Sequence, residues 1–582
     1  MDTDTTPEAD APPMLDPRRW IAFAVVLAAG FMDLLDVTIV NVAVPSIQTD
    51  LGAQYSQIEW IIAAYVLAFA AVLITGGRLG DIYGRKRIFL IGMAGFTLAS
   101  AACGLSAEPA MLIGARFVQG AMAGLMVPQI LAIIRATFPE HERAKAIAVY
   151  SGVGGSASAV GLSLGGLLVQ WDLFDLAWRP IFLVNIPVGI AAWIAAAVVM
   201  RDSRSVASDG LPDARNSAAP RLDLGGMMLA ISAVLLLAYP LTEGRRLGWP
   251  AWTFIMMGAA AVTFGLFVAY ERHRARTVGS PLIDLDLFRS RPFAIGLASW
   301  LLFWIGLGGF FLVWTLFMQA GLGWSPMRAG LTAVFFAVGA GIGAGVSVGV
   351  LAPRFGRRVL IAGGLINASG FGLYGWMAAH YGASIASWQM VIPLIVTGIG
   401  FGMVVAPTID LLLGQIPARE AGSASGLLNT GQQLGTALGV ALVGVVFFGQ
   451  LDHDSARGVE AVTPQVRAEL ATMGLPQQAQ DEILANFLAC VQDRSAEIDP
   501  TVVPDSCRSG SAPGNYGVTQ ALTRAGAQAN AVNFANTFEY TLWYGIAILA
   551  LMCLGFLALP KDARLKQHEL DTEPTDLTPA GV

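Results

Sequence analysis

The sequence predicts an all-α integral membrane protein with fourteen transmembrane helices. The 582 residues are 55% hydrophobic and only 13% charged, and their mean hydropathy is +0.61. Soluble domains carry roughly 25% charged residues, so lipid must be the solvent for much of this chain. The apolar residues also fall into separate runs of about the 20 residues that a spanning helix needs.

Fourteen apolar runs follow one another along the chain, with one long polar interruption before the last. We expect the helices at 20–42, 57–77, 88–107, 110–133, 146–170, 181–200, 225–242, 251–270, 293–318, 329–351, 359–379, 388–413, 422–449 and 537–559.

Lysine and arginine residues in the predicted loops indicate the orientation, because cytoplasmic loops carry the excess of basic residues. With both termini on the inner side, 25 of the 35 Lys and Arg residues fall in inner segments. Most of the outer ones lie in the long 450–536 loop, where this rule is weak. The sequence therefore predicts a multi-pass protein of the plasma membrane with both termini cytoplasmic.

Two sequence matches indicate an internal repeat of the kind found in transporters. Residues 84–86 (Gly-Arg-Lys) match 356–358 (Gly-Arg-Arg), and 139–142 match 417–420 in their Pro and Glu. Both matches are eight predicted helices apart, which predicts two six-helix bundles separated by two inserted helices. The expected divisions are an inner tail (1–19), the first bundle (20–200), a linker (201–224), the inserted helices (225–270), a second linker (271–292), the second bundle (293–559, with the outer loop 450–536) and an inner tail (560–582).

Four segments have the form of known motifs. Residues 77–87 read Gly-Arg-Leu-Gly-Asp-Ile-Tyr-Gly-Arg-Lys-Arg, and the other three segments are 35–45, 116–120 and 178–187. The first resembles the loop signature between helices 2 and 3 of the major facilitator superfamily. The others resemble motifs of helix 1, helix 4 and the entry to helix 6, in particular those of its fourteen-helix drug:proton antiporter branch. The resemblance implies the major facilitator fold and multidrug efflux. In the helix 5 motif, Leu162 stands where that branch carries a proline.

Two acidic residues and one arginine at membrane depth are candidates for proton coupling, because buried ionisable groups in a bilayer are costly. Asp33 and Asp36 share a face of the first helix. Asp36 is expected ~24 Å from the inner end of its helix, and Arg116 ~27 Å from the same end on the antiparallel fourth helix. A carboxylate near an arginine can exchange a proton, with Asp36 favoured over Asp33. The alternative is a static ion pair that fixes the two helices.

A charged loop and a further acid lie near the inner surface. The family resemblance implies that the loop after the second helix is a gate that latches the two halves. The alternative is that its basic residues only set the topology. Asp410, near the inner end of the twelfth helix, is either a second protonation site or a solvated helix end beside Arg419. The gate candidates are Gly77, Asp81, Gly84, Arg85 and Lys86.

Aromatic and amide side chains are candidates for a substrate cavity. Aromatic walls suit flat lipophilic molecules, including cations, and Asn429 and Gln433 are one helical turn apart. The alternatives are aromatic packing against lipid and hydrogen bonds between helices. The candidates are Trp300, Phe303, Trp304, Phe310, Trp314 and Phe317 in the ninth helix, Asn429, Gln432 and Gln433 in the thirteenth, and Gln119 in the fourth.

The long outer loop contains two cysteines, Cys490 and Cys507. They are seventeen residues apart on the oxidising side of the membrane, which predicts a disulfide. The sequence leaves open whether this loop caps the outer vestibule, contacts a partner or packs on itself.

The pattern as a whole favours a transporter over an enzyme. No histidine lies in an apolar run, no cysteine cluster has metal-ligand spacing and no phosphate-binding loop occurs, so we expect neither cofactor, metal nor ATP. The predicted function is proton-coupled export of small lipophilic compounds such as drugs or antibiotics by a monomer, with protons and membrane lipids as further partners and no nucleic acid. The alternatives are an exporter or flippase of lipids or lipophilic metabolites and, from another class, a multi-pass membrane enzyme or lipid-binding sensor.

Overall fold

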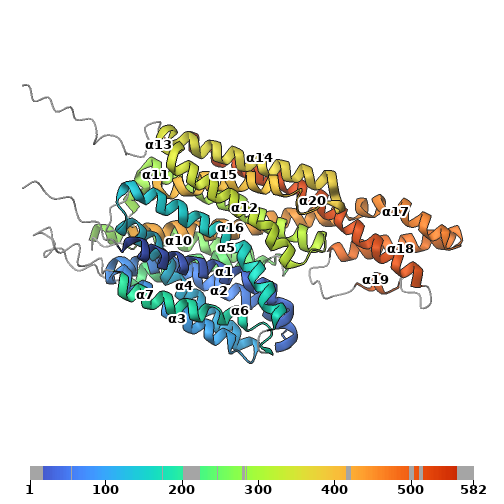
Figure 1. Ribbon diagram of the computed structural model, residues 1–582, viewed down its shortest axis with the longest axis horizontal. Coiled ribbons are helices and arrows are strands. Elements are labelled where there is room, and N and C mark those ends of the chain that lie inside the picture. Colours follow the sequence, from blue (N-terminus) through green and yellow to red (C-terminus); the bar gives the residue numbers. More distant parts are fainter. Residues whose placement is uncertain are drawn as a thin grey trace, which may run out of the picture.

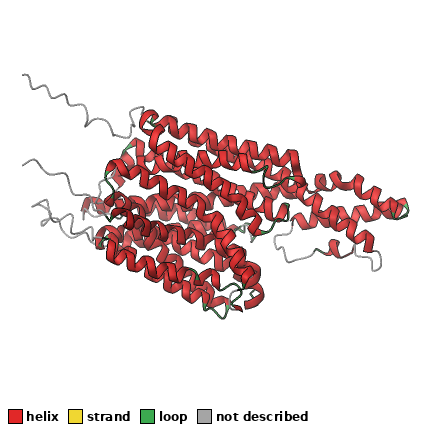
Figure 2. Ribbon diagram, in the orientation of Figure 1, coloured by secondary structure: helices red, strands yellow, loops and turns green. Residues whose placement is uncertain are grey.

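A computed structural model describes residues 18–559, except 54, 173–174, 201–222, 245–246, 278–281, 283–284, 415–420, 497–503 and 510–515. Within these residues the protein is built from helices and contains no strand (Figure 2). The predicted all-α class is therefore confirmed. The predicted inner tails, except Arg18 and Arg19, lie outside the described residues, as do nearly all of the first linker and Arg419.

The long helices follow the predicted order. The first half contains α1 (Arg19–Leu51), α2 (Tyr55–Tyr83), α3 (Arg85–Gly104), α4 (Pro109–Thr137), α5 (Glu140–Trp171), α6 (Pro180–Leu183) and α7 (Asn185–Val199). The inserted pair is α9 (Leu224–Glu243) and α10 (Ala251–Thr277), followed by the short η3 (Leu285–Arg289). The second half contains α11 (Arg291–Leu316), η4 (Phe317–Gly321), α12 (Pro326–Val346), η5 (Ser347–Leu351), α13 (Ala352–Phe355), α14 (Arg357–Tyr381), η6 (Gly382–Ser384), α15 (Val391–Gly414), α16 (Ala421–His453) and α20 (Tyr516–Leu557).

Thirteen helices in the described part of the chain are long and apolar enough to cross a membrane. They coincide with thirteen of the fourteen predicted spans. The remaining prediction, 146–170, falls on α5, which has 32 residues and packs against α1 and α12. At ~1.5 Å per residue such a helix is also long enough to cross a bilayer.

The two halves repeat the same helix contacts. In the first half α2 packs on α4, α3 on α4 and α1 on α5; in the second half α12 packs on α15, α14 on α15 and α11 on α16. Glycines permit the close crossings. A Cβ on Gly120 of α4 would lie 2.2 Å from the Tyr65 carbonyl oxygen on α2, and one on Gly343 of α12 would lie 2.1 Å from that of Ile399 on α15. The same set of helix contacts is thus found in the first and in the second half of the chain.

The matching segments 84–86 and 356–358 share a positive backbone φ at their glycine, and in both a basic side chain binds the end of another helix. Gly84 and Gly356 both have positive φ, 101° and 53°, a region that favours glycine. Lys86 donates hydrogen bonds to the carbonyls of Ala197 (2.8 Å) and Met200 (2.5 Å) at the end of α7. Arg357 donates to the carbonyls of Leu557 (3.0 Å) and Leu559 at the end of α20. In each half, a basic residue after the glycine caps the C-terminus of the last helix.

The two halves meet mainly along α5 with α12 and α2 with α16, with further contacts of α4 with α16 and of α5 with α15. The inserted helices lie outside this contact: α9 packs on α10, α2 and α16. Only 17% of the most apolar stretch of α10 is buried, so most of that helix is left to face lipid. The insertion therefore adds to the bundle without separating the two halves.

The described residues of the predicted outer loop fold into a small helical unit, here called the outer unit, that projects beyond one end of the bundle (Figure 1). Its helices are α17 (Ser455–Thr472), α18 (Gln477–Ala496) and α19 (Asp505–Ser509), packed on the first part of α20. It has its own apolar core, which includes Val466, Leu470 and Phe487. The predicted disulfide is confirmed: the Cys490 and Cys507 sulfurs are 2.05 Å apart.

Candidate functional site

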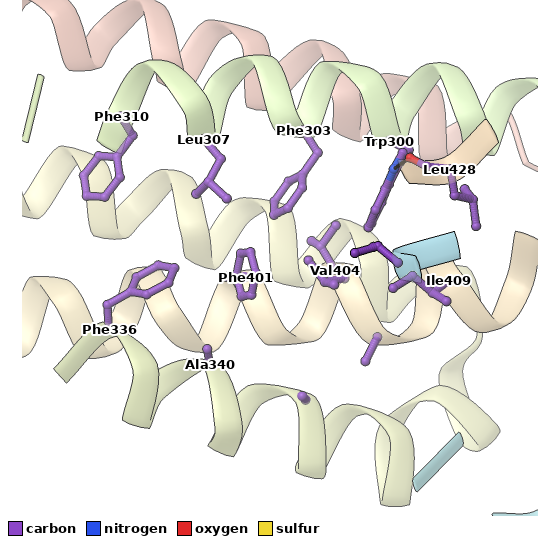
Figure 3. Close-up of a cluster of buried hydrophobic side chains, with 14 of the residues drawn as sticks. Trp300, Phe303, Leu307, Phe310, Phe336, Ala340, Phe401, Val404, Ile409 and Leu428 are labelled. Carbon is purple, nitrogen blue, oxygen red and sulfur yellow. Dashed lines mark hydrogen bonds between the residues drawn. The ribbon is translucent and has the colours of Figure 1, made fainter. Parts of the chain in front are cut away.

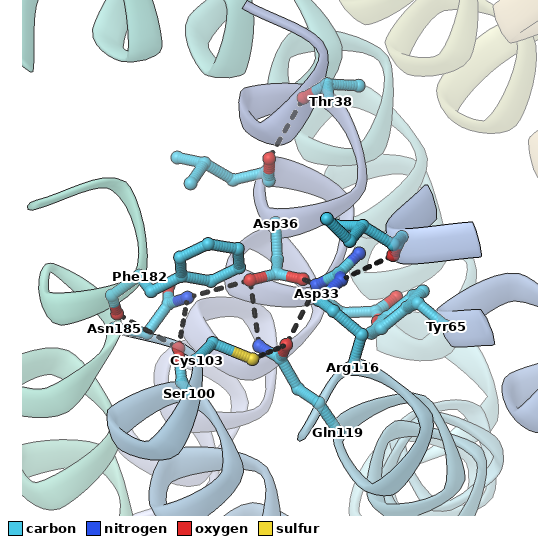
Figure 4. Close-up of polar contacts among 12 residues, drawn as sticks. Asp33, Asp36, Thr38, Tyr65, Ser100, Cys103, Arg116, Gln119, Phe182 and Asn185 are labelled. Carbon is cyan, nitrogen blue, oxygen red and sulfur yellow. Dashed lines mark hydrogen bonds and ion pairs between the residues drawn. The ribbon is translucent and has the colours of Figure 1, made fainter. Parts of the chain in front are cut away.

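A buried polar network surrounds Asp36 in the first half of the protein (Figure 4). Its carboxylate binds the guanidinium of Arg116 from α4. It also accepts hydrogen bonds from the side-chain amides of Gln119, at 2.8 Å, and Asn185, at 3.0 Å. The exposed fractions of Asp36 and Arg116 are 0% and 1%. The proximity predicted from helix depth is therefore present, and α1, α4 and α7 meet at one carboxylate.

Arg116 is supported on several sides besides Asp36. Its guanidinium donates to the Ile61 carbonyl of α2 (3.3 Å) and to the Gln119 amide oxygen (2.8 Å). Its Cζ lies 4.2 Å from the centre of the Tyr65 ring and 5.6 Å from that of Phe182. Because an arginine cannot lose its proton in a protein, this site holds a permanent positive charge that needs these partners.

Asp33 lies one turn before Asp36 and has different surroundings. The Tyr65 hydroxyl donates to its carboxylate at 2.5 Å, and in the described part of the chain this is its one side-chain hydrogen bond. Its exposed fraction is 4%. Tyr65 lies next to both Asp33 and Arg116 (Figure 4). The tyrosine thus links the second carboxylate to the Asp36–Arg116 pair.

Three residues of this network were not assigned a role by sequence reasoning: Tyr65, Ser100 and Asn185. Asn185 donates to Ser100 (3.1 Å) as well as to Asp36. Ser100 in turn donates to the Phe182 carbonyl at 2.9 Å. A buried tyrosine or asparagine in a spanning helix usually has a polar partner, and this was the available signal. Gln119, predicted to line a cavity, directs its amide to Asp36 instead.

The predicted gate residues lie at the end of α2 and the start of α3. Arg85 contacts Asp81 (3.4 Å) and donates to the Ala132 carbonyl of α4 (3.2 Å). With the Lys86 cap on α7, these contacts join helices of the first half. Gly77 lies at the crossing between halves: a Cβ on Gly426 of α16 would lie 3.6 Å from the Gly77 Cα.

Opposite charges from the two halves lie near one another at this same end. Asp410 of α15 lies close enough to Arg135 of α4 for an electrostatic attraction, and Arg85 and Arg143 also approach Arg135. The sequence offered Asp410 as a protonation site or as a solvated helix end. The structure places it opposite an arginine cluster of the other half.

The end of the first half that holds Asp50 has a more exposed set of contacts. Asp50, at the end of α1, accepts from the Trp178 indole at 3.0 Å and from Arg179 at 2.7 Å. The Trp178 hydrogen bond and then the Arg179 contacts keep the pKa of Asp50 below its usual range. This ion pair is half exposed, and so offers a natural comparison with the sealed pair of Asp36 and Arg116.

The aromatic candidates of α11 form a column inside the second half (Figure 3). Phe303 lies 5.8 Å from Phe401 of α15, and Phe310 stacks on Phe371 of α14 at 4.4 Å. Farther along, Phe317 stacks on Phe538 of α20 at 4.8 Å. The five candidates at or below 2% exposure do not face lipid: Trp300, Phe303, Phe310, Trp314 and Phe317.

The indole groups of this column differ in their hydrogen bonding. Trp300 donates to the Leu428 carbonyl (3.0 Å) and Trp314 to the Tyr374 hydroxyl (2.8 Å). The buried N–H of Trp304 has no partner among the described residues. Leaving a buried donor unpaired costs free energy, so Trp304 is the indole of this column whose hydrogen-bonding capacity is unused among the described residues.

The amide candidates of α16 differ in burial. Asn429 is buried and donates to the Ser425 carbonyl of its own helix at 2.8 Å. Gln432 and Gln433 are half-buried. Within the described residues no group of three or more His, Cys, Asp or Glu side chains has the arrangement of a metal site.

Comparison with known proteins gives consistent matches. A family model described as the Major Facilitator Superfamily matches residues 26–440. The chain is 40% identical over 549 residues to a probable actinorhodin transporter of Streptomyces coelicolor, covering 94% of this chain and 92% of that protein. It is 35% identical over 458 residues to a tetracenomycin C resistance and export protein of Streptomyces glaucescens, covering 77% and 80%.

A solved structure supports the fold independently. The human organic anion transporter MFSD10 superposes with a TM-score of 0.51 and 17% sequence identity. The match covers 75% of this chain and 94% of that one. At this level of identity the likeness concerns the arrangement of helices and carries no information on substrate.

Proposed function

Because the chain belongs to the major facilitator superfamily, we propose that it exports small lipophilic compounds of the antibiotic type in exchange for protons. The sealed carboxylate cluster of α1, with Arg116 beside it, is the observation that carries the coupling to protons. Ionisable groups at this depth are costly and commonly belong to proton or substrate pathways. The names of the two bacterial relatives, a transporter of actinorhodin and an exporter of tetracenomycin C, support export of such compounds.

The aromatic column of α11 supports a lipophilic substrate. Large rings offer extensive apolar contact to a flat molecule, and their faces attract a cation. The unpaired Trp304 N–H adds one donor that a carbonyl or hydroxyl oxygen of a substrate can accept. The half-buried amides of Gln432 and Gln433 add further polar contacts. We therefore propose a mainly apolar site with few directional groups, which suits neutral or singly charged compounds.

The contacts between halves suggest how access alternates. Rocking of one bundle against the other changes the α2–α16 and α5–α12 contacts. At the end of the bundle that holds Gly84, the Gly77–Gly426 crossing and the attraction between Arg135 and Asp410 hold the halves together. We propose that these contacts form the cytoplasmic gate, with both termini inside and the disulfide-bonded unit outside the plasma membrane, in a monomer.

Transport by the purified protein in liposomes tests this function. With the lumen more acidic than the medium, inverted molecules are expected to accumulate tetracenomycin C in the lumen. An ionophore that collapses the pH gradient is expected to abolish accumulation, and liposomes without protein give the background. Accumulation that is indifferent to the pH gradient would contradict proton coupling. Scrambling of labelled phospholipid without any antibiotic transport would instead favour a lipid flippase.

A further inference from the structure

The two carboxylates of α1 have unequal surroundings. Asp36 is completely buried. It accepts hydrogen bonds from one charged donor, Arg116, and from two neutral donors, Gln119 and Asn185. Asp33 accepts one neutral donor, the Tyr65 hydroxyl, and keeps an exposed fraction of 4%. Hydrogen bonds and a nearby cation favour the ionised form of a carboxyl group, whereas burial favours the neutral form. The structure therefore stabilises a charge on Asp36 much better than on Asp33.

The charge balance of the cluster leads to the same assignment. Two carboxylates face one guanidinium, since Arg116 stays charged. With both acids ionised the cluster carries one uncompensated negative charge, which is costly at membrane depth. One proton removes that charge, and it binds where the ionised form is less stabilised. That position is Asp33, next to a charged Asp36.

We propose that Asp33, hydrogen-bonded to Tyr65, takes up and releases the transported proton, while Asp36 stays ionised and anchors Arg116. This assignment rests on the proposed proton-coupled function and reverses the order expected from sequence. Uptake forms an O–H bond on the Asp33 carboxylate and release breaks it. Tyr65 keeps its own proton and donates to the ionised form. The groups around Asp33 are Asp36 on α1, Tyr65 on α2, Arg116 on α4 and, on α5, Tyr150.

The position of Asp33 links its protonation to the movement of the two halves. An added Cβ on Gly30, one turn before Asp33, would lie 3.4 Å from the ring of Tyr150 on α5. Helix α5 packs along α12 of the second half, where a Cβ on Gly152 would lie 3.6 Å from Gly341. A charge that appears at Asp33 therefore acts on α5. This helix packs along α12 of the second half, and that contact has to rearrange during transport.

Infrared difference spectroscopy of the purified protein, recorded as pH is changed, tests the assignment without any transport. A protonated carboxyl group has a carbonyl stretching band that disappears on ionisation. We expect this band to be present in the wild type and absent in Asp33→Asn. In Asp36→Asn we expect the band to be retained but to titrate at lower pH, because Asp33 then has no negative neighbour and is the one acid of the cluster that faces Arg116. We expect Tyr65→Phe to make the band titrate about one to two pH units higher, because the ionised form loses a hydrogen bond. Tyr374→Phe is the matched control, since its buried hydroxyl contacts Trp314 and Met390 rather than an acid, and should leave the titration unchanged.

The outcomes separate this assignment from the proposed function. A band that persists in Asp33→Asn, or a wild type without a titrating band, overturns the role of Asp33 even if transport is driven by protons. A wild type that shows the Asp33 band but transports independently of the pH gradient overturns the function instead. If Asp36→Asn does not fold, Asp33→Asn and Tyr65→Phe still decide, because an unshifted titration in Tyr65→Phe contradicts the pairing.

Discussion

The guanidinium of Arg116 on α4 binds the carboxylate of Asp36 on α1, and neither side chain reaches solvent. Two opposite charges at this depth stabilise one another only while both are present. The pair also connects three helices of the first half through Gln119 and Asn185. Its integrity is therefore a condition for the fold of this half as well as for any exchange of protons beside it.

Neutralising one member of this pair is expected to destabilise the protein more than neutralising both. Asp36→Asn leaves a buried guanidinium without its counterion, which typically costs about 3–5 kcal/mol. In the double variant Asp36→Asn/Arg116→Gln that unpaired charge is gone, so yield and melting temperature should partly recover. Thermal unfolding in detergent measures the effect for the two single variants and the double variant.

The exposed pair Asp50–Arg179 is the control for this cycle. Its side chains are 37% and 25% exposed, so replacing either residue should cost about 1 kcal/mol or less. Two outcomes would contradict a stabilising interaction in the buried pair. The losses of stability at Asp36 and Arg116 could be additive, or they could be no larger than the losses at Asp50 and Arg179.

A single methyl group on α4 is expected to disturb the site through the backbone of α2. The Cβ of Gly120→Ala would lie 2.2 Å from the Tyr65 carbonyl oxygen, so α2, which carries Tyr65, has to move away from α4. We expect a loss of about 1–3 kcal/mol in stability. Gly114→Ala, on the same helix but with no atom within 4 Å of its added Cβ, should be neutral or stabilise by roughly 0.5–1 kcal/mol. Equal melting temperatures for the two variants would refute the close crossing.

The paired caps at Lys86 and Arg357 are expected to stabilise their helix ends to a similar degree. Lys86→Met and Arg357→Met each remove charged hydrogen bonds to backbone carbonyls, at a cost of about 1.5–3 kcal/mol. Arg358→Met removes the neighbouring exposed charge and should have little effect. Melting temperatures of the three variants compare them directly, and a drop in Arg358→Met as large as in Arg357→Met would mean that loop charge, not capping, matters.

The disulfide is expected to protect the outer unit from proteolysis. Closing a loop of this length stabilises by ~3 kcal/mol in the chain-entropy description. A reducing agent should therefore speed cleavage within α17–α19 while the spanning helices stay intact. The double variant Cys490→Ser/Cys507→Ser should be cleaved as fast as the reduced wild type and should not respond to the reducing agent. Cleavage that is unchanged by reduction would contradict a stabilising role.

The fold was largely predictable because the bilayer imposes length and polarity on each span. The predictions differ from the structure where the length and polarity imposed by the bilayer no longer determine the helix. The last helix was expected at 537–559, but α20 begins at Tyr516, since hydropathy does not register a helix that continues into water. The sixth span, expected as one helix at 181–200, is divided into α6 and α7 at Val184, which no apolar run can reveal.

The candidate site was predictable in position but not in detail. Depth along antiparallel helices was enough to bring Asp36 to Arg116, because both distances depend only on the helical rise. The contribution of Tyr65 depends on the rotation of α2 about its axis, and that of Asn185 on how α7 meets α1. Both are set by tertiary packing, for which a single sequence carries no periodic signal. The roles of the gate and cavity residues stay predictions.

Proton movement measured during transport tests the exchange most directly. Liposomes containing the protein and a pH-sensitive dye are prepared with equal pH on both sides, and tetracenomycin C is added outside. Antiport predicts that the lumen becomes more alkaline as the antibiotic enters, because each entry is coupled to proton exit. The signal should be absent from protein-free liposomes and from the Asp33→Asn variant. Entry of the antibiotic through the wild-type protein with no change in lumen pH would contradict proton exchange.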